Sequence, residues 1–158
     1  MWIDDGRLGA RVESITPEGA LLRITHAQPR GERLRADKGI NLPETQLGLP
    51  ALSAADLAHL GFVCRHADMV GFSFVEELAD IDTLIEAMQA HTDSPPAIIA
   101  KIETQRAVRN LPELILGTLG RQRLGVMIAR GDLAVELGGE RLAEMQEEIL
   151  WLCEAAHI

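Results

Sequence analysis

The sequence predicts an α/β protein in which parallel βα units follow a short antiparallel β segment. Two observations carry this prediction. After residue 52, three short apolar runs of strand length alternate with helical stripes, whereas the first 40 residues show a hairpin pattern. Strands that are apolar throughout are typical of parallel sheets buried on both faces. Periodicity alone fits an open sheet and a closed barrel equally well.

Composition limits the classes of partner. Apolar residues make up 47% of the 158-residue chain and charged residues 25%, which is ordinary for a globular protein. The net charge is −9, and the first 40 residues hold seven of the 15 Lys/Arg but only six of the 24 Asp/Glu. Without a basic stripe we expect no nucleic-acid partner, although one or two placed cations suffice for a small anion.

The sequence also bears on membrane attachment, targeting and the cellular compartment of the protein. No apolar run approaches the roughly 20 residues of a membrane span, and Asp4 and Asp5 follow Met1 where a targeting segment would be basic. We therefore expect neither an anchor nor a targeting signal. Cys64 and Cys153 lie in separate helix-like stretches, which favours buried free thiols and a reducing cytoplasm.

The first predicted element is an antiparallel hairpin between residues 10 and 27. Apolar residues alternate on both sides of a turn at Pro17-Glu18-Gly19, from Val12 and from Leu21 to Ile24, so we expect one buried face. Pro43 and Pro50 then break regular structure. They predict an extended connector and a domain boundary near residue 40.

The remaining elements alternate helix and strand. The first is a helix N-capped by Ser53, with Leu57, Leu60, Val63 and Cys64 on one side. Three strands are predicted, at 69–75, 97–102 and 125–129. Helices with apolar stripes follow them, from Leu78 to Met88, from Val108 to Ile115 and from Leu142 to Cys153. Pro112 is expected in the first turn of its helix, where its missing N–H costs nothing. Three βα units result.

The second and third strands both end in charge. Lys101 and Glu103 are two residues apart, so their side chains project from the same face of one strand, and Arg130 and Asp132 close the next strand. Chemistry in parallel α/β folds gathers at this edge, and Mg²⁺ commonly takes one or two carboxylates there. A lysine beside such a metal stabilises charge on a transferring group, and Gly131 lets backbone amides approach an anion. The alternative interpretation is two rim salt bridges without catalytic duty.

Five segments resemble pyruvate kinases, in the order in which that family has them. They are WIDDG (family LIDDG), NLPETQLGLPALS (NLPG…LPALS), ADMVGFSFV (D-x-(I/V)-x-x-SFV), AKIETQRAVRN (SKIEN-x-x-G-(V/L)-x-N) and GVMIARGDLAVEL (GIMVARGDLGVE). The segments span nearly the whole chain.

The resemblance implies a (β/α)₈ barrel with an inserted small β-barrel domain that closes over the site. Residues 1–40 would be the returning part of that insert, and residues 41–158 a partial TIM barrel with three parallel βα units, about its fourth to sixth strands. The implied reaction transfers phosphate from phosphoenolpyruvate to ADP, giving pyruvate and ATP, with Mg²⁺ or Mn²⁺. K⁺ would act in the full-length protein through ligands that this chain lacks.

The resemblance also implies roles for individual residues. Lys101 matches the lysine that stabilises the phosphoryl transition state, and Glu103 and Asp132 match the two carboxylate metal ligands. The implied substrate-binding positions are the backbone loop Ala129, Arg130 and Gly131 and the pocket-lining pair Ser73 and Phe74. This is catalysis by positioning and electrostatics.

The chain departs from the family pattern close to these positions. Thr104 replaces an asparagine, Ala134 a glycine, Glu76 an arginine and Glu44 a glycine. Early and late barrel strands and a C-terminal domain are missing. We therefore expect a fragment that is inactive alone and self-associates through its open sheet edges.

Two other functions fit parts of the sequence. Barrel aldolases and lyases that act on pyruvate enolates share an IET segment and a GDLA-like turn, although the lysine before IE and the ARGD sequence favour the kinase. The third hypothesis is an inactive module that binds metal or small anions.

Overall fold

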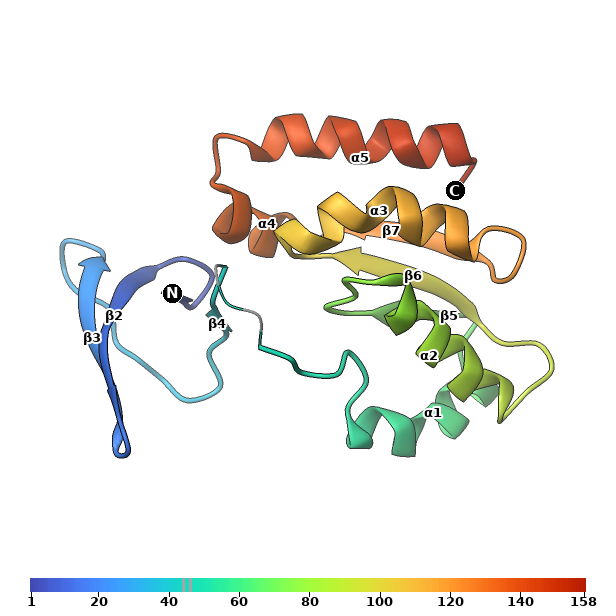
Figure 1. Cartoon of the computed structure of the whole chain (residues 1–158), viewed down its shortest axis with the longest axis horizontal. Coiled ribbons are helices and arrows are strands. Elements are labelled where there is room, and N and C mark those ends of the chain that lie inside the picture. The colour runs from blue at the N-terminus through green and yellow to red at the C-terminus, as the bar shows by residue number, and fades with distance from the viewer. Residues whose placement is uncertain (44, 46) are drawn as a thin grey trace.

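The computed structural model describes residues 1–43, 45 and 47–158 and contains two separate β-sheets (Figure 1). An antiparallel sheet has the order β3-β2-β1-β4, with β1 at Trp2–Ile3, β2 at Leu8–Thr16, β3 at Gly19–His26 and β4 at Ile40–Asn41. A parallel sheet has the order β5-β6-β7, with β5 at Met69–Phe72, β6 at Ala97–Ile102 and β7 at Leu124–Ile128. The mixed α/β class and the parallel units are therefore confirmed.

Five helices accompany these sheets in the described part of the chain: α1 at Ala54–His66, α2 at Leu78–Gln89, α3 at Gln105–Thr118, α4 at Arg130–Leu137 and α5 at Leu142–Ala156. Figure 1 shows the antiparallel sheet beside the α/β part. The two parts touch where β4 meets α4. None of these helices combines the length and the apolar character that a membrane crossing requires.

The N-terminal hairpin is confirmed, but its predicted buried face is wrong. β2 and β3 pair around a tight turn, with Thr16 opposite Gly19. Leu8 and Ala10 are buried at the base of the sheet, beside β1, whereas the outer apolar positions lie open and Ile15 is 81% exposed. The alternating pattern gave the strands correctly, but no described element packs on either side of the outer hairpin.

The main core lies between the parallel sheet and α2 and α3. The predicted stripes on these helices are confirmed, because the side chains of Ile81, Leu84, Leu111 and Leu114 are almost fully buried. On β6, alternate residues Ile98, Ala100 and Ile102 are buried in the same cluster. The opposite face of β6 therefore carries Ile99, Lys101 and, just beyond the strand, Glu103.

The edge strands are not buried on both faces, contrary to expectation. Met69 on β5 and Met127 on β7 are each about half exposed or more, and Gly71 is exposed. Burial of both faces is expected for a strand that has a neighbouring strand on each side and helices packed on both faces of the sheet. Only β6 has a strand on each side in the described sheet.

Three element boundaries also differ from the sequence prediction. The strand predicted at 69–75 ends at Phe72, and the segment after β7 forms the unpredicted helix α4. Pro112 lies in the middle of α3, not in its first turn. The cause is Thr104, whose hydroxyl accepts the Ala107 N–H at 3.1 Å and starts the helix seven residues before the proline.

Two other sequence predictions concern caps and thiols. Ser53 N-caps α1 as predicted and exchanges hydrogen bonds with Asp56 in a capping box. Cys64 and Cys153 are free, although both are only half-buried. Burial raises the pKa of both thiols, so they resist ionisation. Glu44, the residue in place of the family's glycine, lies outside the described residues.

Candidate active site

Lys101 and Glu103 form an ion pair at the C-terminal end of β6. Lys101 Nζ lies 2.6 Å from Glu103 Oε1, and the Glu103 side chain is only 3% exposed. The two residues are two apart on an extended strand, which places both side chains on one face as the sequence predicts. A carboxylate this deeply buried requires a charged or hydrogen-bonding partner, and Lys101 supplies the charge.

The loop after β5 completes the surroundings of this pair. The Phe74 N–H donates to Glu103 Oε2 at 2.7 Å, and Lys101 Nζ donates to Ser73 Oγ at 2.8 Å. The structure therefore brings the four predicted residues Ser73, Phe74, Lys101 and Glu103 together. Each Glu103 oxygen has one partner, which fixes the plane of the carboxylate and leaves one lone pair on each oxygen.

Phe74 adopts a backbone conformation that is unusual for a bulky residue. Its φ angle is +54°, in the left-handed region, and its side chain is more than half exposed. A non-glycine residue pays about 1–2 kcal/mol there. This turn ends β5 at Phe72 and aims the Phe74 amide at Glu103.

Asp132 lies at the same edge of the sheet as Glu103, in the first turn of α4. The strands that precede the two acids are neighbours, with Ile102 paired to Ile128, and Ala129 N donates to Ile102 O at 3.2 Å. The carboxyl ends of β6 and β7 therefore meet, as the sequence predicts. Asp132 is half-buried, and no ion-pair partner for it occurs among the described residues.

The predicted substrate loop 129–131 is the start of a helix instead. Ala129 is buried at the N-cap of α4, and Arg130 and Gly131 form its first exposed residues. Space beside the Gly131 Cα is open, since a Cβ there would meet nothing within 4 Å. Backbone N–H groups at a helix start are free to bind an anion, which is the property the loop was predicted to supply.

Glu136, one turn after Asp132, adds a further carboxylate to this edge. Burial, followed by the charges of Glu76 and Asp132, raises the pKa of the Glu136 carboxyl, while the Gln105 N–H acts in the opposite direction. Glu136 thus links α4 to the start of α3. Sequence reasoning did not identify it, and the only available signal was its position four residues after Asp132 on one helix face.

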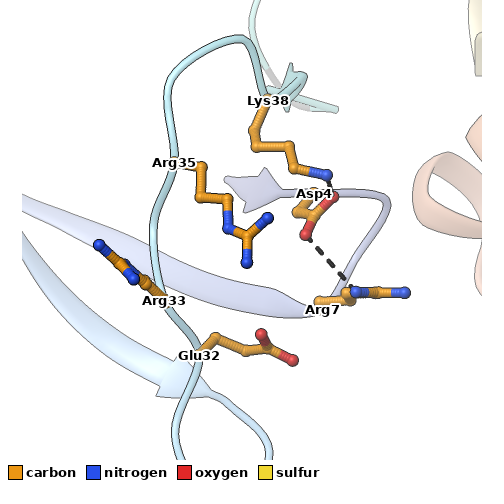
Figure 2. Close-up of a pocket in the computed structure, with 6 residues that line it drawn as sticks. All are labelled: Asp4, Arg7, Glu32, Arg33, Arg35 and Lys38. Carbon is orange, nitrogen blue, oxygen red and sulfur yellow. Dashed lines mark hydrogen bonds and ion pairs between the residues drawn. The ribbon is translucent and has the colours of Figure 1, made fainter.

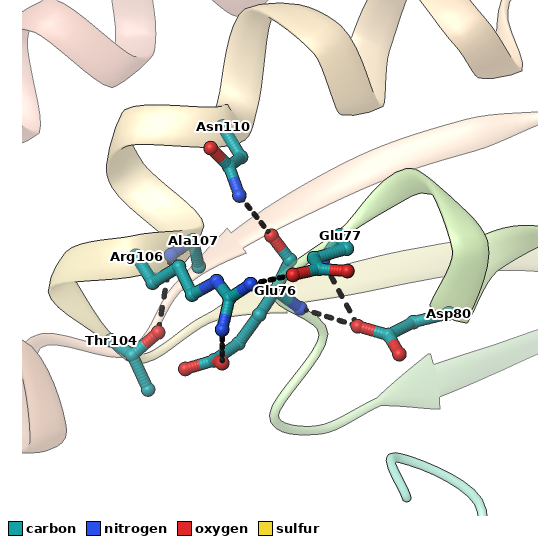
Figure 3. A network of polar contacts seen from close by, with 7 residues as sticks. All are labelled: Glu76, Glu77, Asp80, Thr104, Arg106, Ala107 and Asn110. Atoms are coloured by element: carbon teal, nitrogen blue, oxygen red, sulfur yellow. Dashed lines mark hydrogen bonds and ion pairs between the residues drawn. The ribbon is translucent and has the colours of Figure 1, made fainter. Parts of the chain in front are cut away.

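Sequence reasoning also missed a polar network that joins the starts of α2 and α3 (Figure 3). Arg106 forms ion pairs with Glu76, at 3.8 Å, and with Glu77. Asn110 Nδ2 donates to Glu76 O at 2.8 Å, and Asp80 Oδ2 accepts both the Glu76 and Glu77 N–H groups at 2.9 Å. Glu76, which replaces the family's arginine, therefore has a cationic partner from α3.

A polar hollow of about 200 Å³ in the antiparallel part lies outside this site (Figure 2). Its lining residues are Asp4, Arg7, Glu32, Arg33, Arg35 and Lys38. The Lys38 ammonium, at 2.7 Å, lowers the pKa of Asp4, and Arg7 lies 3.8 Å from the same carboxylate. Carboxylates are interleaved with the cations, which is typical of a salt-bridged turn.

The donor set at the sheet edge suits a hard divalent cation. Glu103 and Asp132 offer carboxylate oxygens, and Mg²⁺ commonly binds one or two carboxylates while it keeps waters or substrate oxygens. Among the described residues no cluster of three or more potential ligands occurs. Any metal held here would thus complete its shell with water or substrate, as a catalytic ion does.

Comparison with known proteins agrees with the motifs at this edge. The family model described as pyruvate kinase, barrel domain, matches residues 1–157. The chain belongs to the pyruvate kinase family. It is 33% identical to the rat pyruvate kinase PKLR over 157 residues, and this match covers 99% of the chain and 26% of PKLR. It is 32% identical over 155 residues to the pyruvate kinase of Clostridium perfringens, covering 98% and 31% respectively.

The family match favours the kinase over the aldolase and lyase alternative. A third relative, the pyruvate kinase of Geobacillus stearothermophilus, is 30% identical over 152 residues and 25% of its length is covered. The chain thus spans about a quarter to a third of the length of these pyruvate kinases.

Proposed function

We propose that this chain carries the divalent-metal site and the transition-state lysine of a pyruvate kinase. The protein that contains it would transfer phosphate from phosphoenolpyruvate to ADP. One observation carries the proposal: the Lys101 ammonium and the buried Glu103 carboxylate are fixed at the carboxyl edge of β6, next to the segment that bears Asp132. This is the part of an α/β fold where substrates bind.

The chemistry assigned to each residue follows from its charge and position. Glu103 and Asp132 would hold Mg²⁺ or Mn²⁺, which supplies positive charge against phosphate oxygens when bound. Lys101, tethered by Ser73, directs its ammonium to the same edge and would stabilise the charge that develops on the transferring group. The start of α4 at Ala129, Arg130 and Gly131 would bind the substrate carboxylate through backbone N–H groups.

The domain organisation forms part of the same proposal. Residues 1–40 would be the returning strands of an inserted lid, and residues 41–158 the three central units of a (β/α)₈ barrel. The antiparallel pairing before residue 42 and the parallel pairing after residue 68 support this division. The open edges of β5 and β7 and the exposed Trp151 favour self-association of the isolated chain, which sedimentation velocity would detect.

Mn²⁺ titration followed by electron paramagnetic resonance tests the metal site directly. Asp132→Ala should weaken Mn²⁺ binding at least about tenfold, because one of two carboxylate ligands is lost. Asp93→Ala is the matched control, since it removes an exposed carboxylate outside the site. Equal binding by both variants would remove Asp132 from the metal site.

Turnover is tested in the complete protein that contains this chain. We expect phosphoenolpyruvate-dependent ATP formation, higher with K⁺, and its loss in a Lys101→Met variant. Cleavage of a 2-oxo acid without ATP formation would indicate the aldolase alternative. Mn²⁺ binding without either reaction would indicate an inactive metal-binding module.

A further inference from the structure

The ion pairs of Arg106 connect the helix after Glu103 to the loop that holds Glu103. We propose that Arg106 is a positioning residue for the metal ligand Glu103: by binding Glu76 and Glu77 it fixes the loop 73–77, so that the Phe74 amide keeps the Glu103 carboxylate in one orientation. The proposal rests on the function proposed above and adds to it a residue at a variable position of the AKIETQRAVRN segment.

The contacts form a closed ring through two segments of the chain. Glu103 accepts the Phe74 N–H, and two residues later in the loop Glu76 is held by Arg106 and Asn110. Both of those residues belong to α3, which begins directly after Glu103 and its N-cap Thr104. Figure 3 shows the side chains of Arg106 and Asn110 reaching from α3 to the loop. A shift of the loop relative to α3 therefore changes the Phe74–Glu103 contact.

The loop requires such fixation because its conformation is strained. Phe74 has φ +54°, and conformations of this kind persist only when surrounding contacts hold them. At the start of the loop, the Ser73 hydroxyl accepts a hydrogen bond from the Lys101 ammonium. Asp80 orders the Glu76 and Glu77 amides, but it lies on α2, the element that the loop itself leads into. Besides the Ser73 and Phe74 hydrogen bonds themselves and the burial of Val75 in the core, the contacts from α3 tie the loop to the helix that directly follows Glu103.

Charge explains why Arg106 is the member that determines the loop position. Glu76 and Glu77 are adjacent carboxylates, and the charge of Glu76, after burial, helps to raise the pKa of the nearby Glu136 carboxyl. Without a cation these groups repel one another and the loop moves outward. Arg106 presents a planar guanidinium that reaches both glutamates at once. All three side chains are about one third to one half exposed, so the ion pairs themselves add little to global stability.

The test separates position from stability. Arg106→Gln should leave the urea midpoint of unfolding nearly unchanged, accelerate hydrogen exchange of the Phe74 amide by NMR, and weaken Mn²⁺ binding about tenfold, as loss of a residue that orients a ligand does. Arg106→Lys keeps the charge but not the planar guanidinium, so it should recover part of the slow Phe74 exchange and part of the Mn²⁺ affinity. Arg109→Gln is the matched control, because this exposed arginine lies on the same helix and makes no ion pair within the described residues.

Amide exchange makes this test independent of the proposed function. If the wild-type chain and Asp132→Ala bind Mn²⁺ alike, the proposed metal site fails, yet Phe74 exchange still reports whether Arg106 holds the loop. If Phe74 exchanges equally fast in Arg106→Gln, Arg109→Gln and the wild type, the positioning role is refuted. The role is also refuted if faster Phe74 exchange and weaker Mn²⁺ binding appear only together with a lower unfolding midpoint, because Arg106 would then act on stability alone.

Discussion

Replacing Lys101 by methionine tests the buried ion pair on which the candidate site depends. The substitution keeps an unbranched side chain that is one atom shorter and removes its charge, so Glu103, at 3% exposure, would retain only the Phe74 N–H. Breaking a buried pair on one side costs about 3–5 kcal/mol, and we expect the lower end, about 3 kcal/mol, because the Lys101 side chain is 27% exposed. For a chain of this size that corresponds to a fall in Tm of about 6–12 °C.

Urea unfolding followed by circular dichroism measures this loss. The double variant Lys101→Met/Glu103→Gln removes both charges and should regain most of the stability, which a double-mutant cycle expresses as a coupling energy. Lys38→Met, which breaks the exposed pair with Asp4, is the control and should unfold almost like the wild type. The reasoning is refuted if Lys101→Met unfolds at the wild-type urea concentration, or if the double variant is no more stable than the single one.

Three further substitutions test the core, the helix cap and the acidic edge. Leu114→Ala, in the core, should lower the free energy of unfolding in urea by about 3 kcal/mol. Leu116→Ala, on the exposed side of the same helix, should lower it by under about 0.5 kcal/mol. Equal losses of stability in the two variants would contradict the packing described. Thr104→Ala should cost about 1 kcal/mol and Thr104→Asn almost nothing, because asparagine also caps; an equal loss in both would show that the side chain does not cap α3. Burial, with neighbouring acids, raises the pKa of Glu136 in the folded chain above its usual 4.5. Ionisation of this carboxyl therefore lowers the free energy of unfolding when the pH is above the raised pKa, and has no such effect below pH 4.5, where the carboxyl is protonated in both states. Glu136→Gln should therefore be more stable than the wild type at pH 7 and equal to it near pH 4; a difference that does not change with pH would contradict this origin.

The sequence predicted the parts of the fold that follow from local periodicity. β6 was predicted at its observed residues, because AIIAKI lies between Pro96 and a polar segment that caps a helix. The pairing of Lys101 with Glu103 also followed from local geometry, since residues two apart on a strand share a face. Periodicity could not report which strands gain neighbours, so the predicted burial of both faces of β5 and β7 was wrong.

The helix boundaries show a second limit of local patterns. Pro112 suggested a helix start because proline is favourable in a first turn. Thr104 is an equally good start signal eight residues earlier, and the structure uses it. Two valid local signals competed, and the buried stripe that includes Ala107 and Leu111 decided in favour of the earlier one. α4 was missed for the opposite reason, because Leu133 is its only buried residue and it has no apolar stripe to detect.

The geometry of the candidate site was predicted only as far as its residues share one strand or lie at the ends of adjacent strands. The contact of Phe74 with Glu103 spans 29 residues and that of Asn110 with Glu76 spans 34. Each depends on a left-handed turn at Phe74 that no sequence pattern announces, because a bulky residue disfavours it. Such a turn exists only where distant contacts compensate its strain. Arg106, at a variable position of the AKIETQRAVRN segment, is therefore identified by the fold, and the contact with Glu76 gives a structural role to Asn110, the last residue of that motif. The same dependence explains why a change on α3 can reach a carboxylate that it does not touch.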